Sequence, residues 1–269
     1  MKFLAVKFVL ALAVFSLAYS SASPQSNGAA AKGATPFIDG ESLAYEGKIS
    51  KIIRGIAVAD LTLTLSKTPN GDDYLVKAEA KSKGTLLKLF RFSFIQELQS
   101  SIDSENFRVV RTVKHDVQKE RVRNSEALFD YSERRVTYVE TDPNEPMRPP
   151  RRIASEIDDA SHDLISGLYS LRLMPLAVGK TFRMSVSDSG LVYEIPVRVT
   201  AREQQKTIFG KQWCFRVEPE VFGTNRLIER EGDMTIWITD DARKLPVRSV
   251  VNTPYGKVDI RLKSAKNLR

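Results

Sequence analysis

The sequence is poor in the residues that build disulfide frameworks, metal centres and membrane spans. Its 269 residues contain one cysteine, which excludes an intramolecular disulfide and a disulfide-rich scaffold. Two histidines, His115 and His162, exclude sites built from several histidines. One apolar run lies near the start, at residues 8–19, and no second hydrophobic span follows it. What remains has an ordinary globular balance, with 42% hydrophobic and 28% charged residues.

Residues 1–20 have the pattern of a signal peptide. Lys2 and Lys7 precede the apolar run, which is shorter than the roughly 20 residues that a membrane span needs. Residues 18–20 (AYS) place small side chains where a signal peptidase reads them, so we predict cleavage after Ser20 or after Ala22. An uncleaved N-terminal anchor is the alternative. Cleavage predicts a protein of the periplasm or the extracellular space.

Export also bears on the partners that we expect. Removal of residues 1–20 leaves 39 basic and 33 acidic residues, a net charge of +6. Such a charge suits anionic lipid headgroups or acidic envelope polymers, although it is also an ordinary soluble surface. No nucleic-acid-binding motif occurs, so we expect no nucleic acid partner and no cofactor. The sole cysteine, Cys214, does not follow the apolar run, which excludes a lipoprotein.

Most of the chain after residue 38 has the alternation of half-buried strands. Residues 21–38, rich in Ser, Ala, Gly and Pro, predict a flexible leader. Asn70-Gly71, between two alternating runs, predicts a hairpin turn. The strands that the period-two pattern predicts are 43–49, 61–65, 74–80, 94–102, 108–118, 136–140, 181–186, 191–200, 212–221, 234–239, 245–251 and 257–262.

One segment has a helical spacing. Apolar residues at 164, 165, 168, 169 and 171 predict a helix over about 159–173, capped by Asp158 or Asp159 and ended by Pro175. Residues 142–152, with four prolines, predict a loop before it. The fold class is therefore mostly β: a curved antiparallel sheet or open half barrel of about a dozen strands with this helix packed on it. The spacing allows a single β-rich domain at 39–265 or two β halves joined around 142–175.

Three blocks resemble a family of bacterial exported proteins, the domain-of-unknown-function family 3108. They are residues 40–45 (GESLAY), residues 163–172 (DLISGLYSLR) followed by Pro175-Leu176 and Gly179, and residues 237–247 (WITDDARKLPV). The resemblance spans about residues 39–265. It implies an envelope-associated, mostly β protein, and it implies no catalytic residue because the family has none assigned.

The residues alone also predict no catalytic or metal site. Ser161-His162-Asp163 has the residue types of a hydrolase triad, but consecutive helix residues point about 100° apart and cannot align. We therefore predict His162 to be a helix-surface histidine. The acids around it, such as Glu156 and Asp158, fit helix capping and the helix dipole better than a cation site. Cys214, within an apolar strand, is predicted to be a buried thiol.

Aromatic and basic residues on the predicted helix and strands are the candidates for ligand binding. The predicted ligand-binding residues are Tyr169, Arg172, Trp213, Trp237, Arg148, Arg151 and Arg152. With Lys114, Lys119, Arg121 and Arg123, the arginines make the middle of the chain basic, and they would form an anion-binding patch if they converged. An exposed Trp237 would indicate a binding face.

Three functions follow from these observations. The first is a non-enzymatic envelope protein that binds a lipid or another apolar or anionic ligand. The second is a structural or assembly factor that binds a partner protein through an apolar patch or an edge strand. The third is a hydrolase that uses paired carboxylates, which needs a cleft containing both.

Overall fold

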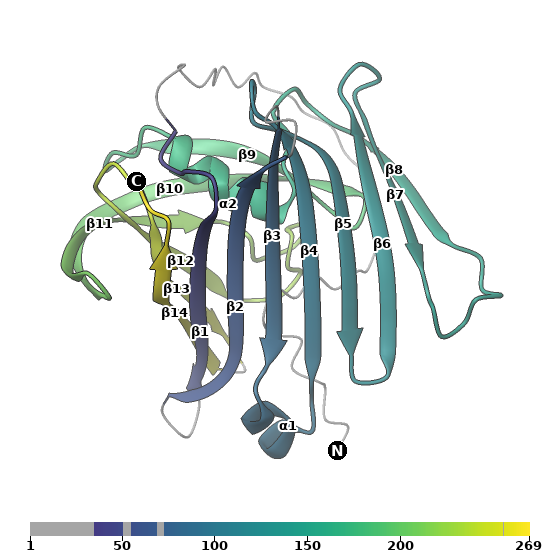
Figure 1. The fold of residues 1–269 in the computed structure, drawn as a ribbon, viewed down its shortest axis with the longest axis horizontal. Coiled ribbons are helices and arrows are strands. Elements are labelled where there is room, and N and C mark those ends of the chain that lie inside the picture. The colour runs from purple at the N-terminus through teal and green to yellow at the C-terminus, as the bar shows by residue number, and fades with distance from the viewer. Residues whose placement is uncertain (1–34, 51–54, 69–72, 255) are drawn as a thin grey trace.

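A single antiparallel sheet of fourteen strands dominates the structure (Figure 1). The computed structural model describes residues 35–50, 55–68, 73–254 and 256–269. Within them the sheet curves strongly but does not close, because its two edge strands form no ladder with each other. The predicted fold class, a curved sheet or open half barrel with one main helix, is confirmed.

The strands are long and two helices accompany them. The elements are β1 (Glu41–Ser50), β2 (Ile56–Lys67), β3 (Asp73–Ser82), α1 (Gly84–Phe90), β4 (Phe94–Asp103), β5 (Arg108–Gln118), β6 (Arg121–Asp130), β7 (Arg135–Thr141), β8 (Arg151–Glu156), α2 (Leu164–Leu173), β9 (Thr181–Asp188), β10 (Leu191–Thr207), β11 (Gly210–Pro219), β12 (Asp233–Thr239), β13 (Pro246–Thr253) and β14 (Gly256–Lys266).

The strand order is that of a meander with two arms. The sheet runs β8-β7-β6-β5-β4-β3-β2-β1-β14-β13-β12-β11-β10-β9, so every neighbour in space is also a neighbour in the chain except β1 and β14. The strands at the two ends of the described chain therefore pair at the middle of the sheet, from Ser42 opposite Lys266 to Ser50 opposite Lys257. The segment containing α2 connects the two sheet edges, β8 and β9.

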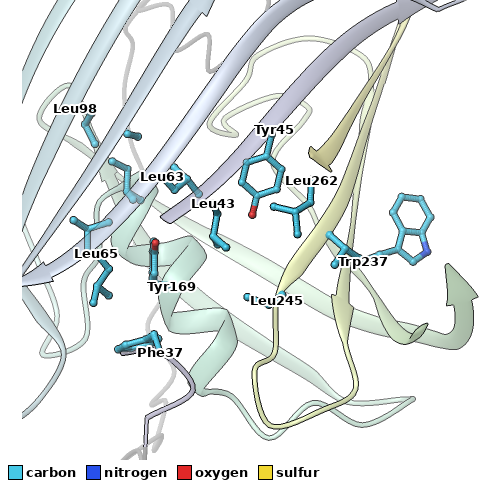
Figure 2. Packing of buried hydrophobic residues seen from close by; sticks show 14 of the residues in the cluster. Phe37, Leu43, Tyr45, Leu63, Leu65, Leu98, Tyr169, Trp237, Leu245 and Leu262 are labelled. Carbon is cyan, nitrogen blue, oxygen red and sulfur yellow. The ribbon is translucent and has the colours of Figure 1, made fainter. Parts of the chain in front are cut away.

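The core lies on the concave face of the sheet, around α2. Ile165 and Tyr169 of this helix pack with strands of both arms, including Leu43 of β1, in the first apolar cluster. Leu171 packs into a second cluster with β9 to β12. Figure 2 shows Tyr169 between Phe37 and the leucines of β1 and β2. Burial against both arms explains why a ten-residue helix with little amphipathic pattern is stable here.

The two edges of the sheet come into contact at the β9–β10 turn. The β9–β10 turn touches the opposite arm, where the Ser155 hydroxyl of β8 donates a hydrogen bond of 2.6 Å to the Gly190 carbonyl oxygen. Gly190 has a φ of +82°, and its α-carbon lies against Tyr138 of β7 and Ile153 of β8. We call this meeting of the two edges the seam.

Several predicted boundaries differ from the structure. The helix begins at Leu164 rather than near residue 159, because the backbone of His162 pairs with β9 and cannot be helical. Its cap is Asp163, not Asp158 or Asp159. The predicted loop 142–152 ends earlier, since β8 begins at Arg151.

Some elements were not predicted. β6 and β8 are rich in charged residues, which masked the alternation, and each has inner positions that are only partly buried. The short helix α1 lies in the connection between β3 and β4.

Parts of the predicted organisation lie outside the described residues. These are the signal peptide at 1–20, most of the leader at 21–38 and the Asn70-Gly71 turn, although β2 and β3 on either side of that turn are paired as a hairpin. The end of the predicted leader is described, and there Phe37 is buried against Tyr169 and Phe107. The packed structure thus begins before residue 39.

Candidate functional site

Two adjoining hollows lie between the start of α2 and the inner face of β3 to β7. The larger has a volume of about 30 Å³ and the smaller of about 10 Å³. Leu98, Lys114 and Leu164 line both, so we treat them as one groove. The other lining residues are Ala78, Ala80, Gln96, Thr112, Ser125, Ala127, Phe129, Tyr138, Asp163, Ser187, Asp188 and Ser189.

Lys114 occupies the junction of the two hollows. The β-sheet register places it between Leu98 of β4 and Ser125 of β6, on the concave side. Among the described residues its ammonium group makes no ion pair and no hydrogen bond. A partly buried lysine without a partner carries a charge that an incoming anion can neutralise.

A cross-strand row extends from Lys114 across the inner face. Directly opposite residues share a face, and Ser125 lies opposite Glu140, which lies opposite Arg151. Glu140 is occupied: Arg123 lies 3.8 Å from it and the Tyr138 hydroxyl donates to it at 2.8 Å. Arg151 forms no ion pair within the described part of the chain, so the row ends in a second free cation.

Asp188 faces these cations from the end of β9. It is buried, and burial raises the pKa of its carboxyl group, while the Lys114 ammonium and the Arg151 guanidinium act in the opposite direction. The Asp163 carboxyl group also lies near Asp188, so two acidic groups and the two cations Lys114 and Arg151 meet at this end of the groove. Neither cation forms a close ion pair among the described residues, which leaves both able to contact an incoming anion.

Asp163 also lines the groove, and both oxygens of its carboxylate accept hydrogen bonds from other groups of the protein. One carboxylate oxygen accepts from the backbone N–H groups of Ile165 and Ser166, at 3.0 and 2.8 Å, and caps α2. The other accepts from the hydroxyls of Thr112, at 2.5 Å, and Ser100. This carboxylate positions the helix on the sheet and is not free for chemistry.

The predicted surface position of His162 is wrong. Its side chain is buried, because the residue lies in an extended segment that pairs with β9 and not on the helix. Burial lowers the pKa of the imidazole from 6.5 to about 4. The Ser161 hydroxyl turns to Asp158 and Ser185, at 2.8 and 3.0 Å, so the three residues do not form a triad.

Tyr169 and Arg172, two predicted ligand-binding residues, lie in the core. Arg172 makes a bidentate ion pair with Glu41 of β1, at 2.5 and 2.8 Å, and both side chains are almost fully buried. Its guanidinium lies 5.2 Å from the ring centres of both Phe37 and Tyr169. These contacts join α2 to the start of the sheet.

The two tryptophans lie apart from the groove. Trp213 of β11 is 46% exposed, with the Arg202 guanidinium 4.5 Å from its ring centre. Trp237 of β12 is buried beside Arg248 and donates its indole N–H to Glu203. Figure 2 shows its ring pointing away from Tyr169 and α2. Cys214 is buried, as predicted, and burial raises the pKa of its thiol to about 12.

The arginines of the basic middle segment do not converge. Arg148 lies exposed in the β7–β8 loop, 3.7 Å from Glu145, and Arg152 lies on the outer face of β8. Arg151, between them, is the predicted ligand-binding residue that lies beside the groove. Ligand binding by the seven residues stays a prediction. Lys114 was counted in the basic segment but not among the seven.

Neither a metal cluster nor a membrane helix occurs in the described residues. No group of three or more His, Cys, Asp or Glu side chains there is placed to hold a metal ion. Within the same residues, no helix is long and apolar enough to cross a membrane.

Comparison with protein families assigns the chain. Residues 44–263 match the family described as Protein of unknown function (DUF3108). The chain belongs to the DUF3108 family. The resemblance that the three sequence blocks carry is thus confirmed, and this DUF3108 chain belongs to a family without an assigned activity. Among curated proteins the comparison finds no relative.

A solved structure shares the fold of this DUF3108 chain. A beta-barrel-like protein of the domain of unknown function DUF1849 from Brucella abortus matches with a TM-score of 0.58 and 8% identity, over 87% of this chain and 99% of that one. A candidate exported protein with a YmcC-like fold from Bacteroides fragilis matches with a TM-score of 0.33 and 12% identity, over 86% and 98% of the two chains. The first likeness shows the fold alone.

Proposed function

We propose that the protein is a non-enzymatic, exported protein of the cell envelope that binds an anionic group in the groove between α2 and β3 to β7. The anionic group would be the headgroup of a lipid or an acidic unit of an envelope polymer. Export rests on the signal-peptide pattern of residues 1–20. The observation that carries the binding site is the unpaired Lys114 ammonium at the junction of the two hollows.

The chemistry of the groove favours a phosphate or a carboxylate. Lys114 and Arg151 supply positive charge, and the hydroxyls of Ser125, Ser187 and Ser189 supply donors next to it. Hydrogen bonds between a cation and an anion are stronger than neutral ones, and they gain further where water is excluded. Phe129, among the lining residues, offers an apolar wall for the part of the ligand that follows the anion.

The seam is the part of the fold that would admit such a ligand. The two hollows have room for about one or two water molecules, since a water needs about 10–15 Å³. A headgroup needs more space, and β8 and β9 are the neighbouring elements that no ladder joins. Separation of these two edges would widen the groove without breaking a strand pair.

The other two functions have less support. The hydrolase requires two free carboxylates in one cleft; Asp163 and Asp188 both line the groove, but Asp163 already accepts four hydrogen bonds. Binding of a partner protein would use the free edges of β8 and β9, which offer backbone groups for strand addition.

Native mass spectrometry of the protein, purified gently from an envelope fraction, tests the proposal. We expect a stoichiometric added mass that organic extraction removes from the wild type and that Lys114→Gln lacks. Lys77→Gln, on the exposed outer face of β3, is the matched control and should keep the added mass. The protein mass itself reports whether the chain begins at Ser21.

Two outcomes would contradict the proposal. A bare wild-type protein would favour a partner protein at the sheet edges instead, to be sought by crosslinking. An added mass that Lys114→Gln retains in full would move the ligand to another site.

A further inference from the structure

The short helix α1 presents apolar side chains to solvent at one end of the molecule. It lies below the ends of β3 and β4, at the bottom of the view in Figure 1. Leu86 anchors it, buried in a cluster with Phe92 and Phe94. Leu87 and Leu89, on either side of that anchor, are 52% and 54% exposed.

Positive charge accompanies these leucines. Lys88 lies between them and points away from the anchored side, because residues two apart on a helix point about 200° apart. Arg91 follows the helix in a left-handed conformation and donates its backbone N–H to the Leu87 carbonyl at 2.9 Å. Lys88 and Arg91 have no ion-pair partner within the described residues.

The surrounding sequence holds no compensating acid. From Ala80 to Gln96 the chain carries four basic residues and neither Asp nor Glu. Lys83, the cap residue of α1, is neutralised by Glu46 and Asp60, at 2.9 and 3.0 Å. The free charge at this end is therefore carried by Lys88 and Arg91, beside the two exposed leucines.

We propose that α1 and Arg91 form a docking surface for an anionic membrane surface. Leu87 and Leu89 would enter the headgroup region while Lys88 and Arg91 contact lipid phosphates. Two leucines offer far less area than the approximately 800 Å² per partner that a stable dimer buries, whereas attachment to a membrane surface adds the attraction between basic side chains and anionic lipids to the apolar area that is buried. This surface is separate from the groove and does not depend on the proposed function.

Co-sedimentation of the protein purified from an envelope fraction with lipid vesicles tests this proposal. We expect binding to vesicles of phosphatidylcholine and phosphatidylglycerol mixed three to one, and little binding to phosphatidylcholine alone. The double variant Lys88→Glu/Arg91→Glu should weaken that binding at least about tenfold, and Leu87→Ser/Leu89→Ser by about fivefold or more. High salt should weaken wild-type binding as well.

Matched controls separate this surface from general effects of charge and hydrophobicity. Leu128→Ser, at a half-exposed leucine on β6, and Lys211→Glu, at the β10–β11 turn, should leave vesicle binding unchanged. All the changed side chains are exposed, so circular dichroism melting should show unaltered folding.

Three results would overturn the proposal: no wild-type binding to the anionic vesicles, equal binding to the neutral ones, or full binding by both α1 double variants. Lys114→Gln distinguishes the two sites, because it should lose the groove ligand and still bind vesicles.

Discussion

The side chain of His162 is buried, and the backbone of this residue is paired with β9. Its backbone N–H donates to the Ser185 carbonyl at 2.9 Å, and its carbonyl accepts from Ser187 at 2.7 Å, so the residue is fixed on β9. Its Nδ1 atom is buried and has no hydrogen-bond partner among the residues that the structure describes. Burial therefore disfavours the imidazolium at this position, and it outweighs the opposite effect of the Asp163 and Asp158 carboxylates.

This burial predicts a specific loss of stability in mild acid. The unfolded chain protonates His162 below its ordinary pKa of 6.5, and the folded chain only near 4. Between these values the unfolded state binds more protons, so the free energy of unfolding falls as the pH falls. We expect His162→Gln to remove on the order of 2 kcal/mol of this fall, measured by urea denaturation at about pH 7 and about pH 4.5.

The comparison of variants isolates this histidine from the carboxylates, which also destabilise the fold in acid. His115→Gln, on β5, is the control and should follow the wild type. Parallel pH dependence of the wild type and His162→Gln would contradict the prediction.

At the scale of elements, the β9–β10 turn packs against β7 and β8 too closely to admit an added methyl group at Gly190. A Cβ atom at Gly190 would lie 2.6 Å from the Cβ of Tyr138 and 2.8 Å from that of Ile153. We expect Gly190→Ala to destabilise the protein by about 2–4 kcal/mol, from overpacking and from the positive φ together. Thermal or urea denaturation measures the effect.

A second glycine, Gly210, allows the cost of the positive φ to be measured apart from the cost of overpacking. It has a similar φ of +85°, but a Cβ there would meet nothing within 4 Å. Gly210→Ala should therefore cost only the conformational part, about 1–2 kcal/mol. Equal losses in the two variants would show that the seam is not closely packed in solution.

The elements also show which patterns predict structure from this sequence. The predicted strand 108–118 coincides with β5, which has a neighbour on each side and buries Val109, Thr112 and Asp116 along its length. β8 is an edge strand with one neighbour, and its inner positions are Arg151, Ile153 and Ser155, so the alternation that identifies strands is weak. The start of α2 escaped prediction because residues just before it pair with β9, a contact that no local pattern encodes.

The groove, too, could be predicted only in part, because it depends on contacts between segments that are distant in sequence. Alternation places Thr112, Lys114 and Asp116 on one face of β5, but both faces of this strand carry polar residues. Which face is concave depends on α2 and β9, which are distant in sequence. The sequence thus identifies the basic residues but not the side of the sheet on which they meet.

At the scale of the whole molecule, Arg172 is the point where separate parts of the chain meet. Besides Glu41, it donates to the backbone carbonyls of Pro36, at 3.4 Å, and Arg243, at 3.1 Å. It thereby connects α2 with the residues before β1 and with the β12–β13 turn. Arg172→Met should cost about 3–5 kcal/mol, because it leaves the Glu41 carboxylate buried without a partner.

Removal of both charges should cost less than removal of one. We expect the double variant Glu41→Leu/Arg172→Met to recover at least half of the loss, as measured by denaturation. Glu145→Gln, in the exposed pair with Arg148, should change stability by less than about 0.5 kcal/mol. A double variant no more stable than Arg172→Met alone would contradict this prediction.

The pairing of β1 with β14 sets an order of events in time. β1 precedes β14 in the chain, so the ladder at the middle of the sheet cannot form until synthesis has passed β14. The hairpins of each arm join consecutive strands and can form as soon as they emerge. Until then β1 has one free edge, and a chain truncated before β14 would keep that edge permanently exposed to strand-to-strand aggregation.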